Sequence, residues 1–285
     1  MRVAIIGLGL IGGSLGLALK KAEAKNFEIT GYVRRPEAAS VAMSRGAVDR
    51  VETSLDAAVK GAGMVVIATP VLTIKGIMSR IADSLSPGCI VTDAASTKAQ
   101  VMKWASELLP PAVDFIGGHP MAGREAYGMK AAEADLFQGC VYCLTPPDGV
   151  SPQAVDRLVD MVKRIGATPF FIGAEEHDRL TAAISHLPFI LSAALVSSTA
   201  GEPSWDRMSL LAASGYRDLT RLASGNPEVN AHICRTNREA ILHWIDRFIE
   251  ELERYRKLVS SDDKRLEEAL AEASRLRQKW LSKAK

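Results

Sequence analysis

His119 is the side chain whose surroundings best suit it to act on a substrate. It lies in the segment GGHPMAG, after a strand-like stretch and among residues of little side-chain bulk, which would leave the imidazole accessible. The ordinary pKa of histidine, about 6.5, suits such a side chain to accept a proton near neutral pH. Judged alone, a single histidine is more often a hydrogen-bonded part of the core, so His119 is a candidate base.

A second histidine and two arginines follow in the later part of the chain. His186 begins the apolar stretch HLPFILSAAL, where a lone histidine is more often structural than a ligand. Arg217 and Arg221 are four residues apart and would share one face of a helix, with Asp218 beside them. Two guanidinium groups there could bind carboxylates through paired hydrogen bonds, or could simply face solvent. The remaining histidines look structural: His177, His232 and His243.

A glycine-rich turn near the N-terminus predicts the binding of a dinucleotide. Gly7, Gly9 and Gly12 form GLGLIG between the strand-like RVAII and a helical stretch, with Leu10 and Ile11 inside the turn. The first glycine permits the bend, the second lets backbone approach a pyrophosphate, and the third lets helix and strand pack closely. Backbone N–H groups at the helix N-terminus would then bind the anion. The alternative is a tight turn with a structural role only.

The end of the second strand indicates which dinucleotide is bound. NAD-selective proteins place an acidic residue there to bind the ribose 2′-hydroxyl, but this chain continues from Val33 into Arg34 and Arg35. An arginine can instead pair with a 2′-phosphate, so the sequence favours NADP over NAD, unless both arginines are simply solvated. Thr69 and Pro70 close the strand MVVIATP at the edge where such sheets bind ligands, and we expect them to contact the cofactor.

The order of the segments predicts the fold that positions these residues. Up to about residue 172, short β-branched runs alternate with helical stretches, which indicates an α/β domain with a doubly wound, mostly parallel sheet of the Rossmann type. From residue 173 to 285 the strand-like runs vanish and helical periodicity takes over. We therefore expect a dinucleotide-binding domain over 1–172 and an all-helical domain over 173–285.

The helical part of the sequence suggests a second copy of the chain as partner. Apolar residues recur at helical intervals along what we expect to be one long helix, and Ser260 to Asp263 would break it before a last helix. The residues of this stripe are Ile233, Ile241, Ile245, Phe248 and Leu252. Long helices of this kind are often shared between subunits, which favours a homodimer over packing within one chain.

Composition excludes several other functions. The 285 residues carry a net charge of only +2, which favours neither a nucleic-acid surface nor a membrane-binding face and leaves a small molecule as the expected partner. We see no signal peptide and no run approaching about 18 apolar residues, so we expect a cytoplasmic protein. Cys140 and Cys143 have the CxxC spacing of metal and redox sites, but in the strand expected there the two thiols would point to opposite faces, and no other metal-ligand cluster is seen.

Taken together, six motifs resemble one enzyme family. In order along the chain they read GLGLIGGSL, ATP, DAASTK, GGHPMAG, SHLPF and GYRDLTRLASGNP, and they span both expected domains. They are similar to the prephenate and arogenate dehydrogenases of tyrosine biosynthesis. GGHPMAG and SHLP make the similarity specific, because they are far rarer than the glycine turn.

The resemblance implies a role for each matching residue. His119 would bind the ring hydroxyl of the substrate and act as base, and Ser96 would touch the same hydroxyl and help orient that histidine. His186 would line the substrate pocket and Arg221 would bind a substrate carboxylate, with Arg217 a weaker candidate. An ionic network closing the pocket would include Glu125 and Asp218.

The implied reaction is an oxidative decarboxylation of prephenate or arogenate, with hydride transfer to NADP or NAD. Loss of carbon dioxide would leave an aromatic phenol, which makes the step effectively irreversible. The sequence does not distinguish the two substrates. The rival interpretations are another dehydrogenase with a Rossmann half and a helical half, such as the 3-hydroxyacid or pyrroline-carboxylate reductase types, or a non-catalytic NADP sensor.

Overall fold

The structure is a computed structural model that describes residues 1–23, 27–33, 36–124, 126–261 and 264–283. The chain forms two compact units, Met1–Arg238 and Glu239–Lys285. The first unit contains the expected sheet and also the part of the expected all-helical domain that comes before residue 239. The expected change from sheet to helix near residue 172 is present, because the last strand ends at Phe171 and the next helix begins at Ala174. As a domain boundary, residue 172 stays a prediction.

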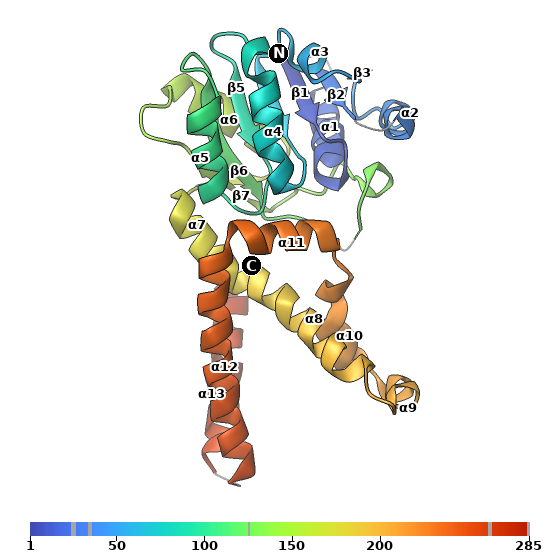
Figure 1. The fold of residues 1–285 in the computed structure, drawn as a ribbon, viewed down its shortest axis with the longest axis vertical. Coiled ribbons are helices and arrows are strands. Elements are labelled where there is room, and N and C mark those ends of the chain that lie inside the picture. The colour runs from blue at the N-terminus through green and yellow to red at the C-terminus, as the bar shows by residue number, and fades with distance from the viewer. Residues whose placement is uncertain (24–26, 34–35, 125, 262–263, 284–285) are drawn as a thin grey trace. The chain divides into compact units, whose positions relative to one another are not determined.

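The first unit is built on an eight-stranded sheet with the strand order β3-β2-β1-β4-β5-β6-β7-β8 (Figure 1). Only the pair β6 and β7 is antiparallel, so the expected mostly parallel, doubly wound sheet is confirmed. The sequence did not predict the three-residue β3. The strands are β1 (Arg2–Ile6), β2 (Glu28–Tyr32), β3 (Arg50–Glu52), β4 (Met64–Ile67), β5 (Ile90–Asp93), β6 (Asp114–Pro120), β7 (Val141–Thr145) and β8 (Thr168–Phe171).

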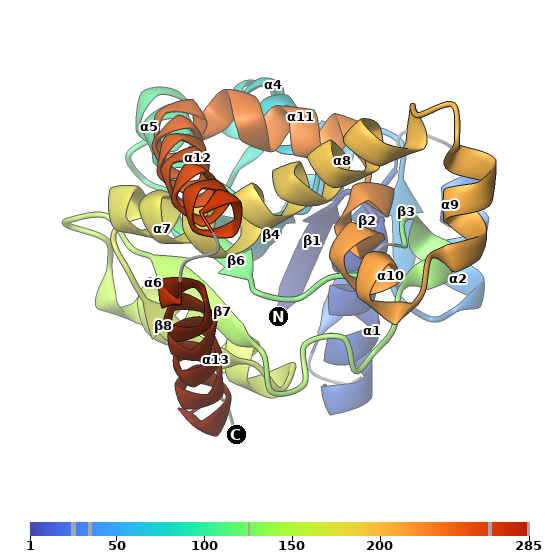
Figure 2. The same cartoon turned by 90° about the horizontal axis from the view of Figure 1, so that it is seen from below.

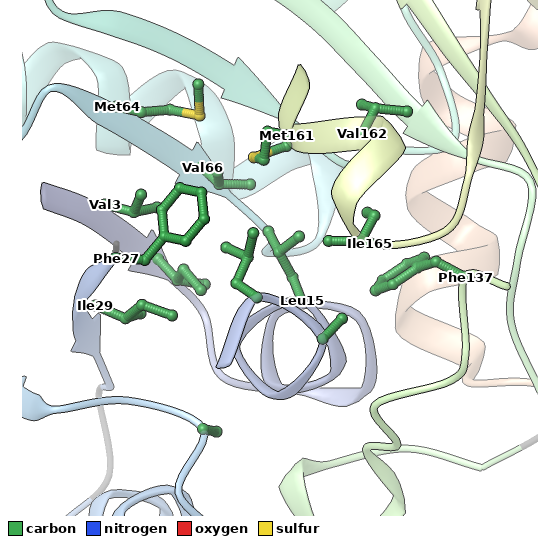
Figure 3. Close-up of a cluster of buried hydrophobic side chains, with 14 of the residues drawn as sticks. Val3, Leu15, Phe27, Ile29, Met64, Val66, Phe137, Met161, Val162 and Ile165 are labelled. Atoms are coloured by element: carbon green, nitrogen blue, oxygen red, sulfur yellow. The ribbon is translucent and has the colours of Figure 1, made fainter. Parts of the chain in front are cut away.

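Helices cover both faces of this sheet because its central strands are apolar on both sides. Along β1, Val3 and Ile5 belong to one buried cluster while Ala4 and Ile6 belong to another. Figure 3 shows the first cluster, in which Leu15 packs with residues of β1, β4 and the helix α6. The covering helices are α1 (Leu10–Glu23), α2 (Pro36–Ser44), α3 (Leu55–Val59), α4 (Val71–Ile81), α5 (Ala99–Leu108) and α6 (Pro152–Arg164).

The rest of the first unit is helical. Figure 2, a view from below, shows α8 and α11 lying across the edge of the sheet. Between α7 and α8, a turn of π-helix spans Ala182–His186. Pro188, two residues after this turn, has no N–H to offer the Ile184 carbonyl, which explains why the regular helix is interrupted here. The helices are α7 (Ala174–Thr181), α8 (Leu187–Ala200), α9 (Trp205–Leu211), α10 (Ser214–Thr220) and α11 (Pro227–Thr236).

The helical run that contains α7 and α8 contradicts the expectation that no segment is apolar enough to span a membrane. The continuous run Ala174–Ala200 is long and apolar enough to cross a bilayer by length and composition, with a mean hydropathy of 1.7 over its most apolar window. Only 28% of that window is buried within the chain. The expectation that no run is this apolar is therefore wrong, because small and aliphatic residues dominate the start of α8. The cytoplasmic location stays a prediction.

The second unit contains α12 (Arg238–Ser260) from its second residue onward, and α13 (Arg265–Lys283). The expected single helix carrying the stripe from Ile233 to Leu252 is wrong, because α11 ends at Thr236 and Asn237 leaves the helical conformation with φ −129° and ψ 38°. The expected break after Ser260 is present, although Asp262 and Asp263 lie outside the described residues.

Candidate active site

A cavity of about 720 Å³ lies at the carboxyl ends of β1, β4 and β5. Ligands of open α/β sheets bind at this edge, at the point where the strand order reverses, and here β2 and β4 flank β1. Residues of the helical part also line it, among them Ser185 of the π turn and Phe189 of α8. The cavity volume falls within the range of about 300 to 1,000 Å³ that is typical of small-molecule sites.

The glycine turn forms one wall of this cavity, and the space around each glycine agrees with the role expected for it. Gly7 adopts a left-handed φ of +99°, and a Cβ on Gly12 would lie 2.0 Å from the Gly7 carbonyl oxygen. By contrast, a Cβ on Gly9 would meet nothing within 4 Å, so the open space beside Gly9 fits a ligand that approaches the backbone closely. Leu10 and Ile11 at the N-terminus of α1 line the cavity next to Gly9. This cradle fits the pyrophosphate of a dinucleotide.

Thr69 and Pro70 also line the cavity, directly after β4. Thr73 in the first turn of α4 holds them in place, because its hydroxyl bonds Thr69 Oγ1 at 2.9 Å and donates to the Pro70 carbonyl at 2.7 Å. Ser96 lines the cavity after β5. The turns after three neighbouring strands therefore present backbone and hydroxyl groups to one space.

His119 lies near the end of β6, opposite Cys143 in the antiparallel pair, and only 8% of it is exposed. Its Nδ1 is 2.9 Å from Nε2 of His177, whose own Nδ1 is 2.8 Å from Oδ1 of Asp178. Burial lowers the pKa of His119 well below 6.5, and the positive charge of the nearby Lys98 acts in the same direction. The ring is therefore neutral at pH 7, the form that can accept a proton.

Asp178 is fixed by the N-terminus of α5. Its two carboxylate oxygens accept the backbone N–H groups of Lys98 at 2.7 Å and Ala99 at 2.9 Å. The Lys98 ammonium group is fully buried, where it pairs with Asp93 and donates to the Gly118 carbonyl at 2.6 Å. These bonds tie the strand that carries His119 to the helix that Asp178 caps.

His186, at the end of the π turn, is fully buried. The Asn237 amide nitrogen lies 3.2 Å from His186 Nδ1 and donates to the Asp178 carbonyl at 2.7 Å. Burial lowers the pKa of His186 to about 4, with Asp178 opposing and His177 adding to the shift, so this ring is also neutral at pH 7. Among the described residues, no group is hydrogen-bonded to its buried Nε2.

The other expected site residues are placed as follows. Arg221 begins a 3₁₀ turn, Arg221–Ser224, and lines the cavity. Arg217 and Asp218 lie on α10 and are not among the described residues of the wall. Neither histidine ring belongs to the described wall, but Met121 and Ser185, close to them in sequence, do. The expected contributions of Glu125, Arg34 and Arg35 lie outside the described residues.

His177 and Asp178 are the residues at this site that the sequence did not indicate. His177 looked structural in its charged segment, yet the fold brings its ring onto His119, 58 residues earlier in the chain. No spacing in a single sequence could have revealed this contact.

Comparison with known proteins identifies the family. "Prephenate dehydrogenase, nucleotide-binding domain" matches residues 15–170, and "Prephenate dehydrogenase, dimerization domain" matches residues 173–273. The chain is 37% identical over 263 residues to the prephenate dehydrogenase of Bacillus subtilis, covering 92% of this chain and 71% of that protein. It is 31% identical to the cyclohexadienyl dehydrogenase of Zymomonas mobilis, covering 92% and 89% of the two chains.

Solved structures agree with the sequence comparison. The Synechocystis arogenate dehydrogenase has a TM-score of 0.82 at 33% identity, with 98% of this chain and 100% of that chain covered. The A. aeolicus prephenate dehydrogenase in complex with hydroxyphenyl propionate and NAD+ has a TM-score of 0.90 at 27% identity, with 98% of each chain covered. On both sequence and structure, the chain belongs to the prephenate dehydrogenase family.

Proposed function

We propose that this chain catalyses the oxidative decarboxylation of prephenate or arogenate with hydride transfer to a nicotinamide dinucleotide, a reaction of tyrosine biosynthesis. One observation carries the proposal: the glycine turn and Arg221 line a single cavity, and so does Met121, two residues after the neutral, buried His119. The names of the relatives support the same chemistry over the rival dehydrogenase types, and a non-catalytic sensor would need no such base.

In the proposed reaction, a bound nicotinamide supplies the hydride acceptor. His119 Nε2 takes the proton of the ring hydroxyl as hydride leaves the ring carbon that bears this hydroxyl. Ser96 forms a hydrogen bond with the hydroxyl and holds it in place. The ring carboxylate then leaves as carbon dioxide, and its bonding electrons complete the aromatic ring. His119 returns the proton to the resulting phenolate oxygen, so the base is regenerated within one turnover.

Arg221 and His186 would hold the substrate for this step. A guanidinium group binds a carboxylate through two charge-assisted hydrogen bonds, and Arg221 lies in the cavity wall. The unbonded Nε2 of His186 is a buried polar atom that needs a partner, which a polar group of the substrate would provide. Neither side chain needs to change its protonation state for this role.

The proposed function is tested by steady-state assays with each substrate and each cofactor. We expect reduced nicotinamide to form with prephenate or with arogenate, and the ratio of the two kcat/KM values gives the preference. Replacing the proposed base in His119→Ala should lower kcat by about 10²-fold to 10⁴-fold, the usual contribution of a general base. Turnover of the variant within a few-fold of wild type would contradict this role for His119.

For the cofactor we propose NADP as the preferred form, with NAD as the alternative. The support is the absence of an acid at the end of β2, where Tyr32 and Val33 precede the arginines at 34 and 35. The double variant Arg34→Ala, Arg35→Ala should raise the KM for NADP far more than the KM for NAD. An equal rise for both cofactors would refute the inference.

We also propose that the chain acts as a homodimer formed through its helical region. The support is the match to a dimerization domain and the exposure of Leu210 and Leu211 on α9, at 85% and 84%. Large apolar side chains exposed to this degree commonly mark interfaces. Light scattering should give twice the chain mass for the wild type and less for Leu210→Ser, Leu211→Ser; a monomeric wild type would refute the proposal.

A further inference from the structure

The hydrogen-bonded chain from His119 through His177 to Asp178 has no part in the reaction as proposed so far. From its geometry we infer that His177 and Asp178 are positioning residues, which hold His119 in the tautomer whose Nε2 is unprotonated. The inference rests on the proposed function, because that function requires a base at Nε2. The tautomer itself, however, can be measured without any substrate.

The direction of the bonds follows from the end of the chain at Asp178. Both oxygens of this carboxylate already accept backbone N–H groups, from Lys98 and Ala99, so it acts here as an acceptor. His177 must then donate from Nδ1 to Asp178 Oδ1 across 2.8 Å. A neutral His177 with its proton on Nδ1 has a lone pair on Nε2.

That lone pair determines which ring nitrogen of His119 is protonated. His119 Nδ1 lies 2.9 Å from His177 Nε2, so it donates its proton there. A neutral imidazole that carries its proton on Nδ1 has its lone pair on Nε2, the nitrogen that a base must present to the hydroxyl. In the opposite tautomer an N–H group would face the substrate, and His119 could not accept the proton.

The backbone carbonyl of Asp178 also determines, through Asn237, which nitrogen of His186 is protonated, and the result is the opposite tautomer. The Asn237 amide group donates one hydrogen to the backbone carbonyl of Asp178, which shows that the nitrogen of the amide, and not its oxygen, lies on this side. Its other hydrogen is donated to His186 Nδ1. His186 therefore carries its proton on Nε2. The two histidines are thus prepared for different tasks, since His119 presents an acceptor and His186 presents a donor.

The residues of this hydrogen-bonded network are held in place by the elements that carry them. Asp178 is fixed to the start of α5, His119 belongs to the sheet, and Asn237 follows α11. His177 itself is fully buried, which leaves its ring little freedom to rotate. The orientation of the base is therefore built into the fold before any ligand binds.

The direct test is ¹⁵N NMR of the histidine rings in the 285-residue chain at pH 7, because only five histidines have to be assigned. We expect His119 to show a protonated Nδ1 and an unprotonated Nε2, and His186 to show the reverse. In His177→Phe, which fills the space without an acceptor, His119 should become a mixture of tautomers. A His119 protonated on Nε2 in the wild type, or unchanged in this variant, would overturn the inference.

Kinetics provide a second test that a merely structural role would not satisfy. His177→Phe should lower kcat by about 10-fold to 10⁴-fold, the upper value being the effect of a wrong histidine tautomer in a catalytic triad, while the KM for the cofactor stays near wild type. His177→Gln, whose amide oxygen can still accept from His119 Nδ1, should recover part of the lost kcat. The matched control is His243→Phe, which removes an exposed histidine.

The possible failures are distinguishable. If the NMR tautomers are as expected but the wild type turns over neither prephenate nor arogenate, the proposed function fails and the positioning of His119 stands. If the wild type is active but His177→Phe and His177→Gln have equal kcat values, with wild-type thermal stability, the positioning role is refuted.

Discussion

Acid should destabilise the first unit through its buried histidines, and His186 allows the effect to be quantified. Its pKa is about 4 in the folded protein and 6.5 for the free side chain. Below pH 6.5 the unfolded chain therefore binds a proton that the folded chain excludes, and the free energy of unfolding falls. Between pH 7 and pH 5 this loss amounts to about 2 kcal/mol from His186 alone. The lowered pKa of His119 acts in the same direction.

Urea denaturation at pH 7 and at pH 5 measures this loss. The informative variant is His186→Asn, because an amide oxygen can replace Nδ1 as acceptor for Asn237 but does not titrate. It should reduce the difference between the two pH values by about 2 kcal/mol, whereas His243→Asn, at an exposed position, should not change it. An equal pH dependence in His186→Asn and wild type would show that His186 does not resist protonation in the fold.

Three further predictions concern the cofactor turn, the substrate carboxylate and the buried ion pair. Gly12→Ala places a Cβ 2.0 Å from the Gly7 carbonyl oxygen and should weaken NADPH binding in a fluorescence titration, whereas Gly76→Ala, with nothing within 4 Å, should bind normally. Arg221→Lys keeps the charge but loses the paired hydrogen bonds, so the KM for the substrate should rise more than kcat falls. Lys98→Met leaves Asp93 buried without its ammonium partner and should lower the free energy of unfolding by about 3 to 5 kcal/mol in urea titrations.

The sheet and the cofactor turn were predictable because their signals are local. Buried parallel strands such as β1 and β4 are short apolar runs, and glycines at 7, 9 and 12 have roles fixed by the immediate turn. β3 was missed because three residues at the margin of a sheet carry no periodic pattern. The apolar stripe likewise could not show the break at Asn237, since α11 and α12 continue the same helical spacing on both sides of it.

The site was predictable only in part. The spacing of Arg217 and Arg221 suggested one shared helical face, but α10 ends at Thr220 and a 3₁₀ turn begins at Arg221. His119 was identified as the base because the motif GGHPMAG resembles that of a known family, and not because of any spacing between residues. The contact with His177 depends on how α7 packs beside β6 and α5, a tertiary contact that no local pattern encodes.

The central claim is that this site oxidises and decarboxylates its substrate in one coupled reaction with His119 as base. The most direct measurement is the amount of carbon dioxide released and of reduced nicotinamide formed in the same reaction with prephenate or arogenate. We predict equal amounts of the two products for the wild type, and formation of both products at least about 100-fold more slowly for His119→Ala at a cofactor concentration that saturates binding. Reduced nicotinamide without carbon dioxide, or equal rates in wild type and variant, would contradict the account.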